Sequence, residues 1–273
     1  MAVFGQPVAG NPTQYMMEKA FAHLGIDWRY LTLEVAPETL GDAIRGMRAM
    51  GFRGCNLTIP HKVVVIQYLD RTSEAATLMG AVNTVNRVGK ELVGENTDGK
   101  GFVQSLREVT DPAGKNILIL GAGGAARAIA VEVGLAGAAQ LTIVNRSAAR
   151  GQELVDLLND KAKVSSRFVP WEGNVEVPPE TEVVINATSI GLGDADARVP
   201  LAVQTLEPDM VVADVVFNPP ETRLLRDAKQ RGCKTLDGLG MLVNQAVIAF
   251  KIWTGRDANA EIMRDALEEF LGF

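Results

Sequence analysis

Short apolar runs alternate along the chain with segments in which apolar residues recur every three or four positions. Buried or half-buried strands are predicted at residues 2–5, 28–35, 54–58, 116–120, 141–144, 183–185 and 210–213. Helices are predicted at 13–24, 38–50, 98–109, 124–136, 148–158, 236–254 and 258–271, with short helical pieces over 62–79. A β-hairpin is predicted from 82–88 and 91–94. This alternation indicates an α/β fold with mostly parallel strands.

Turn residues divide the predicted elements into two groups. The segment Thr-Asp-Pro-Ala-Gly at 110–114 is a cluster of turn formers, and the pattern beyond it is more regular. A second boundary is placed near residues 237–238, where composition changes little. A length of 273 residues is typical of about two domains. We therefore predict a separate domain over 111–237.

Composition excludes several classes of function. The net charge of −6 argues against nucleic acid or an anionic membrane as partner. With two histidines, two distant cysteines and no Cys-x-x-Cys, neither a zinc site nor a dithiol redox pair is expected. Redox chemistry would therefore require a bound cofactor. No leader-like segment and no apolar run of about 20 residues is present, so the expectation is a cytoplasmic protein without a membrane partner.

A glycine-rich turn joins the predicted strand 116–120 to the helix that follows. Its sequence, Gly-Ala-Gly-Gly-Ala-Ala at 121–126, has the spacing G-x-G-x-x-A of dinucleotide-binding loops. Gly121 would permit the tight turn, and Gly123 would let the backbone approach a pyrophosphate at the helix N-terminus. A glycine-rich turn that serves only packing is the alternative.

The next predicted strand ends in residues that favour NADP(H) over NAD(H). An NAD site usually carries an acidic residue about 20 positions after the loop, whereas this strand leads into Asn145, Arg146 and Ser147, with Arg150 one turn later. Two guanidinium groups and a hydroxyl suit a 2′-phosphate, which an acid would repel. Two solvated arginines are the alternative, although cations are unfavourable at a helix start.

Three polar clusters follow predicted strands of the first domain, at 56–62, 80–86 and 95–99. Open α/β sheets bind ligands at such strand ends. Reduction of a ketone by hydride transfer needs a proton donor, and a lysine oriented by a carboxylate is the natural choice where histidines are few. Lys62 and Asp98 fit these two roles. Their alternatives are a solvated lysine and an aspartate that only caps a helix.

Seven motifs in order resemble those of the shikimate dehydrogenase family. They are Gly-Cys-Asn-Leu-Thr-Ile-Pro-His-Lys (54–62), Gly-Ala-Val-Asn-Thr (80–84), Asn-Thr-Asp-Gly (96–99), Gly-Ala-Gly-Gly-Ala (121–125), Asn-Arg-Ser (145–147), Asn-Ala-Thr-Ser-Ile-Gly (186–191) and Gly-Leu-Gly-Met-Leu-Val-Asn-Gln-Ala (238–246). Together they span most of the chain. The resemblance implies the reversible NADPH-dependent reduction of 3-dehydroshikimate to shikimate, a step of the shikimate pathway to aromatic amino acids.

The resemblance also implies a division of the chain and a set of site residues. A catalytic, substrate-binding α/β domain would comprise 1–110 and 238–273, with a Rossmann NADP-binding domain over 111–237 inserted into it. Lys62 matches the acid/base and Asp98 its partner. The implied substrate-binding residues are Asn11, Thr13, Thr58, Asn83, Phe217 and Gln245. The implied cofactor-binding residues are Gly121, Ala122, Gly123, Gly124, Ala125, Asn145, Arg146, Ser147, Arg150, Asn186, Ala187, Thr188, Gly238 and Met241.

Three positions depart from the family pattern where the substrate carboxylate is expected to bind. Asn11 and Thr13 stand at the positions of two serines, and Phe217 replaces a tyrosine. Asparagine and threonine still donate hydrogen bonds, whereas phenylalanine does not. Asn11 and Thr13 would, alternatively, only cap the first helix, and Phe217 would only pack in the core.

These departures keep other functions open. Quinate or an amino-substituted shikimate is an alternative substrate, and a non-catalytic NADP(H)-binding regulator is an alternative class. A methylene-tetrahydrofolate dehydrogenase is less favoured, because the motifs at 96–99 and 238–242 would then lack a role. The expected partner is a small carboxylate substrate. The sequence leaves monomer and homodimer undecided.

Overall fold

The computed structural model describes all residues, 1–273, and contains two six-stranded sheets. The chain divides into two compact units, one formed by Met1–Thr97 with Val243–Phe273 and the other by Asp98–Leu242. The predicted α/β class is confirmed. The domain boundaries predicted at 110 and 238 stay a prediction, and the two units are described separately below.

The sheet of the first unit is mixed. Its strands are β1 (Ala2–Gly5), β2 (Leu31–Glu34), β3 (Gly54–Leu57), β4 (Arg71–Thr72), β5 (Thr84–Val88) and β6 (Glu91–Glu95), in the order β2-β1-β3-β5-β6-β4. β1 pairs in parallel with β2 and β3, whereas β5 runs antiparallel to β3 and β6. The predicted hairpin reverses the direction here, so this sheet is less parallel than the alternation of elements suggested.

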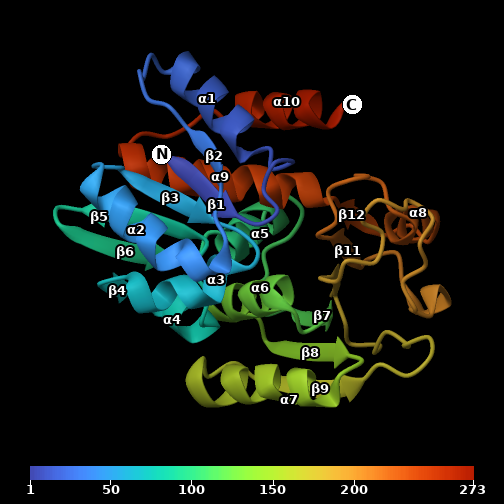
Figure 1. Cartoon of the computed structure of the whole chain (residues 1–273). Coiled ribbons are helices and arrows are strands. Elements are labelled where there is room, and N and C mark those ends of the chain that lie inside the picture. Colours follow the sequence, from blue (N-terminus) through green and yellow to red (C-terminus); the bar gives the residue numbers. More distant parts are fainter. The chain divides into compact units, whose positions relative to one another are not determined.

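Helices cover both faces of this sheet (Figure 1). They are α1 (Thr13–His23), α2 (Leu40–Ala49), α3 (His61–Val64), α4 (Glu74–Met79), α9 (Gly238–Thr254) and α10 (Ala260–Leu271). Buried Leu40 and Ile44 of α2 pack in one cluster with Phe4 of the sheet. Trp253 of α9 donates its indole N–H to the carbonyl of Val85, 2.9 Å away. Burial on both faces is complete for the central strands β1 and β3, whereas β2 is largely exposed.

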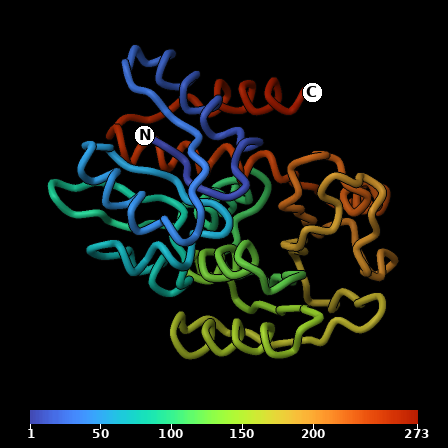
Figure 2. Tube along the Cα trace, viewed as in Figure 1, coloured from blue at the N-terminus to red at the C-terminus, as the bar shows by residue number.

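The C-terminal segment belongs to the same unit as the N-terminal segment. Figure 2 shows the red end of the tube beside its blue beginning. The ring of Tyr15 lies 6.2 Å from that of Phe270, and Lys19 of α1 forms an ion pair of 3.3 Å with Glu269 of α10. The first unit is therefore completed by residues that follow the whole of the second unit along the chain.

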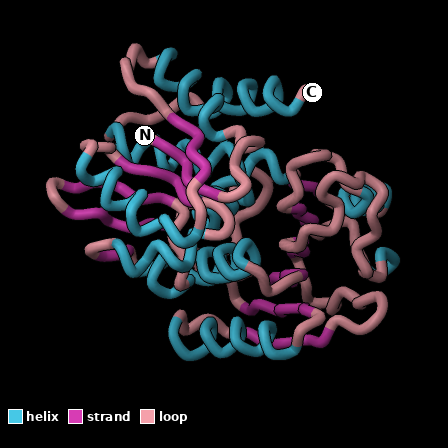
Figure 3. The backbone as a smooth tube through the Cα atoms, viewed as in Figure 1, coloured by secondary structure: helices cyan, strands magenta, loops and turns pink.

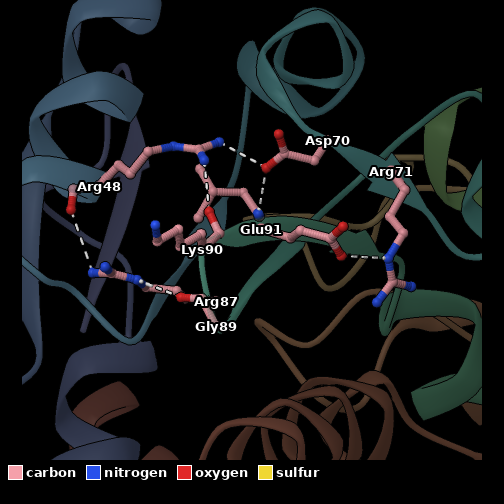
Figure 4. A network of polar contacts seen from close by, with 8 residues as sticks. Arg48, Asp70, Arg71, Arg87, Gly89, Lys90 and Glu91 are labelled. Atoms are coloured by element: carbon pink, nitrogen blue, oxygen red, sulfur yellow. Dashed lines mark hydrogen bonds and ion pairs between the residues drawn. The ribbon is translucent and has the colours of Figure 1, made fainter.

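A polar network holds the hairpin between β5 and β6 (Figure 4). The guanidinium group of Arg48 donates to Asp70 at 2.8 Å and to the carbonyl of Lys90 at 2.7 Å. Asp70 also accepts the backbone N–H of Leu92 at 2.6 Å. Both the ion pair and this backbone hydrogen bond lower the pKa of Asp70, the latter more strongly. The network therefore ties the hairpin turn to α2.

The sheet of the second unit is entirely parallel, and Figure 3 shows the strands in magenta. Its strands are β7 (Asn116–Leu120), β8 (Gln140–Asn145), β9 (Ser166–Pro170), β10 (Val183–Asn186), β11 (Val211–Asp214) and β12 (Lys234–Leu236). The order β12-β11-β10-β7-β8-β9 is that of dinucleotide-binding sheets. The chain adds strands outward from β7 on one side and then from β10 on the other, so the strand order reverses between β7 and β10. The helices of this unit are α5 (Asp98–Leu106), α6 (Gly124–Leu135), α7 (Ala148–Asp156) and α8 (Arg223–Gln230).

Four elements were not predicted from the sequence. β4 and β12 have two and three residues, too few for a period to show. β9 (Ser-Arg-Phe-Val-Pro) is half-exposed and lacks an apolar run. The three buried residues of α8, Leu224, Leu225 and Ala228, do recur at helical spacing, so this short helix was missed although the sequence carries its pattern. None of the helices combines the length and the apolar character needed to cross a membrane.

Candidate active site

Polar residues of three strands meet at one edge of the first sheet. The carboxyl end of β3, the amino end of β5 and the carboxyl end of β6 coincide there, because Asn56 pairs with Thr84 and Thr84 with Glu95. Thr58 follows β3, Asn83 precedes β5, and the Asn-Thr pair at 96–97 follows β6. The three polar clusters predicted from the sequence, at 56–62, 80–86 and 95–99, each contribute residues to this edge, so the structure partly brings them together.

The amide of Asn83 is held in one orientation at this edge. Its oxygen accepts the backbone N–H of Thr97 at 2.7 Å, and its nitrogen donates to the Thr97 hydroxyl at 3.0 Å. Beneath it, Asn56 donates to the carbonyl of Asn83 at 3.1 Å and accepts from the hydroxyl of Tyr30 at 2.5 Å. All four side chains are buried. Such a satisfied network is rigid, and Tyr30 is a member that no sequence motif revealed.

The loop that carries Lys62 is anchored on both sides. The backbone N–H of Thr58 donates to Phe4 of β1 at 2.9 Å, and the carbonyl of Lys62 accepts from Val82 at 2.7 Å. The His61 ring is 1% exposed, and its Nε2 lies 2.8 Å from the carbonyl of Val35. Because a carbonyl only accepts, this nitrogen carries the proton. His61, which the sequence left without a role, thus fixes the backbone beside the half-buried Lys62.

The two residues at the family's serine positions stand on either side of Pro12, the N-cap of α1. Asn11 accepts the backbone N–H of Thr13 through its side-chain oxygen at 2.9 Å, so its NH2 group is the part that can donate to a ligand. Thr13 is 5% exposed. Gln245 is buried on α9. The capping alternative and the substrate-binding role of Asn11 are compatible, since they use different atoms.

In the second unit, the loop after β7 has the form that a pyrophosphate requires. Gly121 has φ +112°, and a Cβ there would lie 3.0 Å from the carbonyl oxygen of Ala187. A Cβ on Gly123 would meet nothing within 4 Å, and no side chain caps α6. Ala122, Gly124 and Ala125 complete the loop and the first turn of α6. The backbone N–H groups at this helix start are therefore open to an anion, and the fit to a dinucleotide is good.

Two arginines stand uncompensated at the end of β8. Ser147 caps α7 by accepting the backbone N–H of Arg150 at 3.4 Å, and Asn145 donates to the carbonyl of Ser147 at 2.9 Å. Arg146 and Arg150 are exposed, and neither guanidinium takes part in an ion pair. By contrast, Arg167 pairs with Glu180 at 2.6 Å. Two free cations at a helix start suit a phosphate.

The loop after β10 is shaped by a buried amide. Asn186 accepts the hydroxyl of Thr188 at 2.7 Å and donates to Asp214 at 2.9 Å. Asp214 also accepts the backbone N–H of Val216 at 3.0 Å and the hydroxyl of Thr222 at 2.7 Å. The side chains of Asn186 and Ala187 are buried. The groups of this loop that remain for a ligand are its backbone and Thr188, next to the point where the strand order reverses.

Asp214 gives this loop a pH dependence. Burial raises the pKa of its carboxyl from 3.8 to about 6, against the three hydrogen bonds that lower it. The folded protein therefore holds the proton more tightly than the unfolded chain. This contribution to stability is present below the unfolded pKa and is lost as the pH rises through the folded pKa.

We expect Asp214→Asn to remove this loss of stability at higher pH, because an amide does not ionise. The amide oxygen can still accept from Val216 and Asn186, and its NH2 group can donate to Thr222. Between about pH 4 and about pH 7, the difference in unfolding free energy should shift in favour of the variant by roughly 2 kcal/mol. Urea unfolding of both proteins across this range measures it. A difference that stays constant with pH would contradict the raised pKa.

Two further predicted residues lie at the start of α9. A Cβ on Gly238 would lie 2.5 Å from the carbonyl oxygens of Val215 and Val216. Only glycine therefore lets the first turn of α9, which belongs to the second unit, approach the segment after β11. Half-buried Phe217 is the next residue of that segment, and half-buried Met241 lies one turn into α9. Asp98 begins α5 in the second unit, whereas Lys62 belongs to the first unit. Their pairing stays a prediction.

The dinucleotide strand order, the open helix start and the two free arginines define the class as a nucleotide-dependent oxidoreductase that has a separate α/β unit. Family models match three parts of the chain: the shikimate dehydrogenase substrate binding domain over residues 3–85, shikimate / quinate 5-dehydrogenase over 104–191, and the shikimate 5′-dehydrogenase C-terminal domain over 238–268. The chain belongs to the shikimate dehydrogenase family.

Similar proteins agree with this assignment. A shikimate dehydrogenase (NADP(+)) of Geobacter metallireducens is 43% identical over 270 residues, 97% of this chain and 94% of that one. A shikimate 5-dehydrogenase of Thermus thermophilus, in complex with NADP(H) and shikimate, is 34% identical with a TM-score of 0.86 over 98% of each chain. The ligand-free 5-ketofructose reductase of Gluconobacter sp. strain CHM43 is 51% identical, with a TM-score of 0.96 over 98% of this chain and 97% of that one. The predicted family and its NADP-dependent enzyme class are confirmed.

Proposed function

We propose that this protein catalyses the reversible NADPH-dependent reduction of 3-dehydroshikimate to shikimate. The observation that carries the proposal is the pair of prepared sites: the edge of the first sheet with Lys62 and the fixed amide of Asn83, and the open start of α6 in the second unit. NADPH, when bound, supplies the hydride. A regulator without activity would have no need of the anchored lysine loop.

The residues of the chain then handle the proton and the hydroxyl groups. Lys62 donates a proton from its ammonium group to the oxygen that becomes the alcohol, and accepts it in reverse. Asp98 orients that ammonium group. The amide of Asn83, together with the Thr58 hydroxyl and the Gln245 amide, holds hydroxyl groups of the substrate. The start of α6 binds the pyrophosphate, and Arg146 and Arg150 bind the 2′-phosphate.

The carboxylate end of the substrate has fewer donors here than the family pattern supplies. The hydroxyl that a tyrosine would offer at position 217 is missing, whereas the NH2 group of Asn11 can still donate because its contact with Thr13 uses only the side-chain oxygen. A hydrogen bond to a charged group contributes roughly 1.5–3 kcal/mol. The site therefore has less for a carboxylate than the family pattern provides.

A second candidate is therefore the reduction of 5-ketofructose. Identity to the 5-ketofructose reductase is 51%, against 34% for the shikimate-bound structure. 5-Ketofructose is a neutral polyhydroxy diketone, so it has no carboxylate to bind. The same proton donor, amides and cofactor site would serve both reactions.

The test compares the specificity constants of the purified protein for 3-dehydroshikimate and 5-ketofructose, followed by loss of NADPH absorbance. Shikimate and quinate are compared in the oxidation direction with NADP+ and NAD+. Turnover of 3-dehydroshikimate with the largest specificity constant supports the main proposal. A larger value for 5-ketofructose replaces it by the second candidate, and equal or better turnover of quinate than of shikimate overturns the assignment in favour of quinate. No turnover of any of these four compounds leaves an amino-substituted shikimate as substrate or the non-catalytic regulator.

We expect Phe217→Tyr to lower KM for shikimate about tenfold to a hundredfold, because the new hydroxyl supplies a hydrogen bond to a carboxylate. KM for neutral 5-ketofructose should stay unchanged in the same variant, which makes that substrate the internal control. Steady-state kinetics with both substrates measure the effect. If shikimate gains nothing, Phe217 does not face the carboxylate.

Two further properties belong to the proposal. We infer a cytoplasmic location, which the buried free thiols of Cys55 and Cys233 support, since reduced cysteines are typical of reducing compartments. Monomer and homodimer both remain compatible with the site, because every proposed residue comes from one chain. Light scattering of the purified protein distinguishes them.

A further inference from the structure

A cavity of about 390 Å³ lies beside the ends of β8 and β9 in the second unit. It is lined by Arg146, Trp171, Gly173, Asn174, Ile190 and Pro200. Arg146 is the residue assigned to the 2′-phosphate, and Ile190 ends the loop that Asn186 shapes. The segment 171–174, however, belongs to no motif found in the sequence. The volume lies in the range of small-ligand pockets.

Trp171 is a fixed wall of this cavity. Its backbone N–H donates to the carbonyl of Asn145 at 3.1 Å, and its indole N–H donates to the carbonyl of Pro200 at 2.9 Å. A β-bridge between Val175 and Leu201 ties the same two segments together. The indole packs against the core on one side and is half-buried. The polar atom of the ring is thus satisfied, and the half-buried indole lines the cavity.

The lining has the chemistry of a purine site. Trp171 offers a π face, and Ile190 offers an aliphatic surface. Arg146 adds a guanidinium that no acid neutralises, and exposed Asn174 adds an amide able to hydrogen-bond a base edge. Flat aromatic bases stack on such side chains with little dependence on base identity. A cavity between the phosphate-binding arginine and the loop after β10 is where the adenosine half of a dinucleotide must lie if its pyrophosphate sits at α6.

We propose that Trp171 contacts the adenine ring of the bound cofactor and contributes to its affinity. The proposal rests on the proposed use of NADP(H), and it assigns a separate task to a separate residue. Arg146 and Arg150 recognise the phosphate that distinguishes NADP from NAD. Trp171 recognises the base that both share, so its loss should weaken both cofactors by the same factor.

The first test is binding of 2′,5′-ADP, NADP+ and NAD+ by calorimetry. Trp171→Ala should weaken all three roughly 5- to 100-fold, whereas Trp171→Phe, which keeps an aromatic face, should restore most of the affinity. Binding of nicotinamide mononucleotide, which has no adenine, should not change. Thermal melts of both variants show whether they are folded, and the Phe variant keeps the test usable if the Ala variant is not.

The second test uses the position of the three tryptophans. Trp28 and Trp253 lie in the first unit, so Trp171 is the tryptophan of the second unit. Titration with 2′,5′-ADP should quench the emission of the wild-type protein and of Trp28→Phe. The quenching should vanish in Trp171→Phe although calorimetry still shows binding.

The outcomes separate the two proposals. If 2′,5′-ADP and NADP+ do not bind the wild-type protein, the proposed function fails. If they bind but Trp171→Ala binds as tightly as wild type and the quenching persists in Trp171→Phe, the role of Trp171 fails while the proposed function stands. A loss for NADP+ alone, with NAD+ unchanged, would place Trp171 at the phosphate and overturn the assignment to the base.

Discussion

Replacement of Lys62 by alanine is expected to lower kcat by about 10²–10⁴-fold, the usual contribution of a positioned proton donor. The loop around Lys62 is held by backbone hydrogen bonds and by His61, none of which uses the Lys62 side chain. The fold of the loop should therefore survive. The dissociation constant of NADP+ should not change, because the cofactor site lies on residues of the second unit.

Lys62→Arg separates two roles of this lysine. Arginine keeps the positive charge but does not release its proton at accessible pH. If Lys62 transfers a proton, kcat of this variant should be nearly as low as that of Lys62→Ala. If Lys62 acts only by its charge, the arginine variant should be active. Lys90→Ala, a change in the distant hairpin turn, is the matched control. A near-normal kcat in Lys62→Ala would remove Lys62 from the mechanism.

The second large effect concerns the choice of cofactor. We expect the double variant Arg146→Ala, Arg150→Ala to bind NADP+ and 2′,5′-ADP at least about 100-fold more weakly, since each charge-assisted hydrogen bond contributes roughly 1.5–3 kcal/mol. Affinity for NAD+ should stay the same, because it lacks the 2′-phosphate. The preference for NADP+ should thus disappear, and the salt dependence of binding should fall with it.

Arg167→Ala is the matched control for this experiment. It removes the same charge from the same unit, but its guanidinium already pairs with Glu180 at 2.6 Å. We expect no change in cofactor affinity from it. Equal losses for NADP+ and NAD+ in the double variant would show that the arginines do not read the phosphate.

The sequence predicted best where one short segment carries the whole physical requirement. The loop at 121–126 is an example, because strand, glycines and helix start are contiguous and the structure places them as expected. The hairpin and the long helices were predicted for the same reason. β9 was missed because none of its residues is buried, and β4 and β12 because such short strands are defined only by their pairing partners. The helix α8 was missed although its buried residues recur at helical spacing.

Residues whose task depends on distant partners were also missed. Tyr30 reaches Asn56 from 26 positions away, and His61 reaches Val35 over the same separation. Asp214 is shielded by residues from three segments, and its raised pKa has no local signature. The indole of Trp171 is held in place by a hydrogen bond to the carbonyl of Pro200, 29 residues later. No pattern of neighbours reveals such contacts, since the fold alone brings them together.

The discontinuous first unit has a consequence for synthesis. The second unit, Asp98–Leu242, is one uninterrupted stretch, whereas the unit with Lys62 needs Trp253 against Val85 and α10 against α1. Domains generally begin to fold in the order in which they leave the ribosome. The half that holds the cofactor loop can therefore close first, and the half that holds the proton donor waits for the last helices. A chain truncated before Val243 would contain the whole nucleotide-binding unit but only part of the unit that binds the substrate.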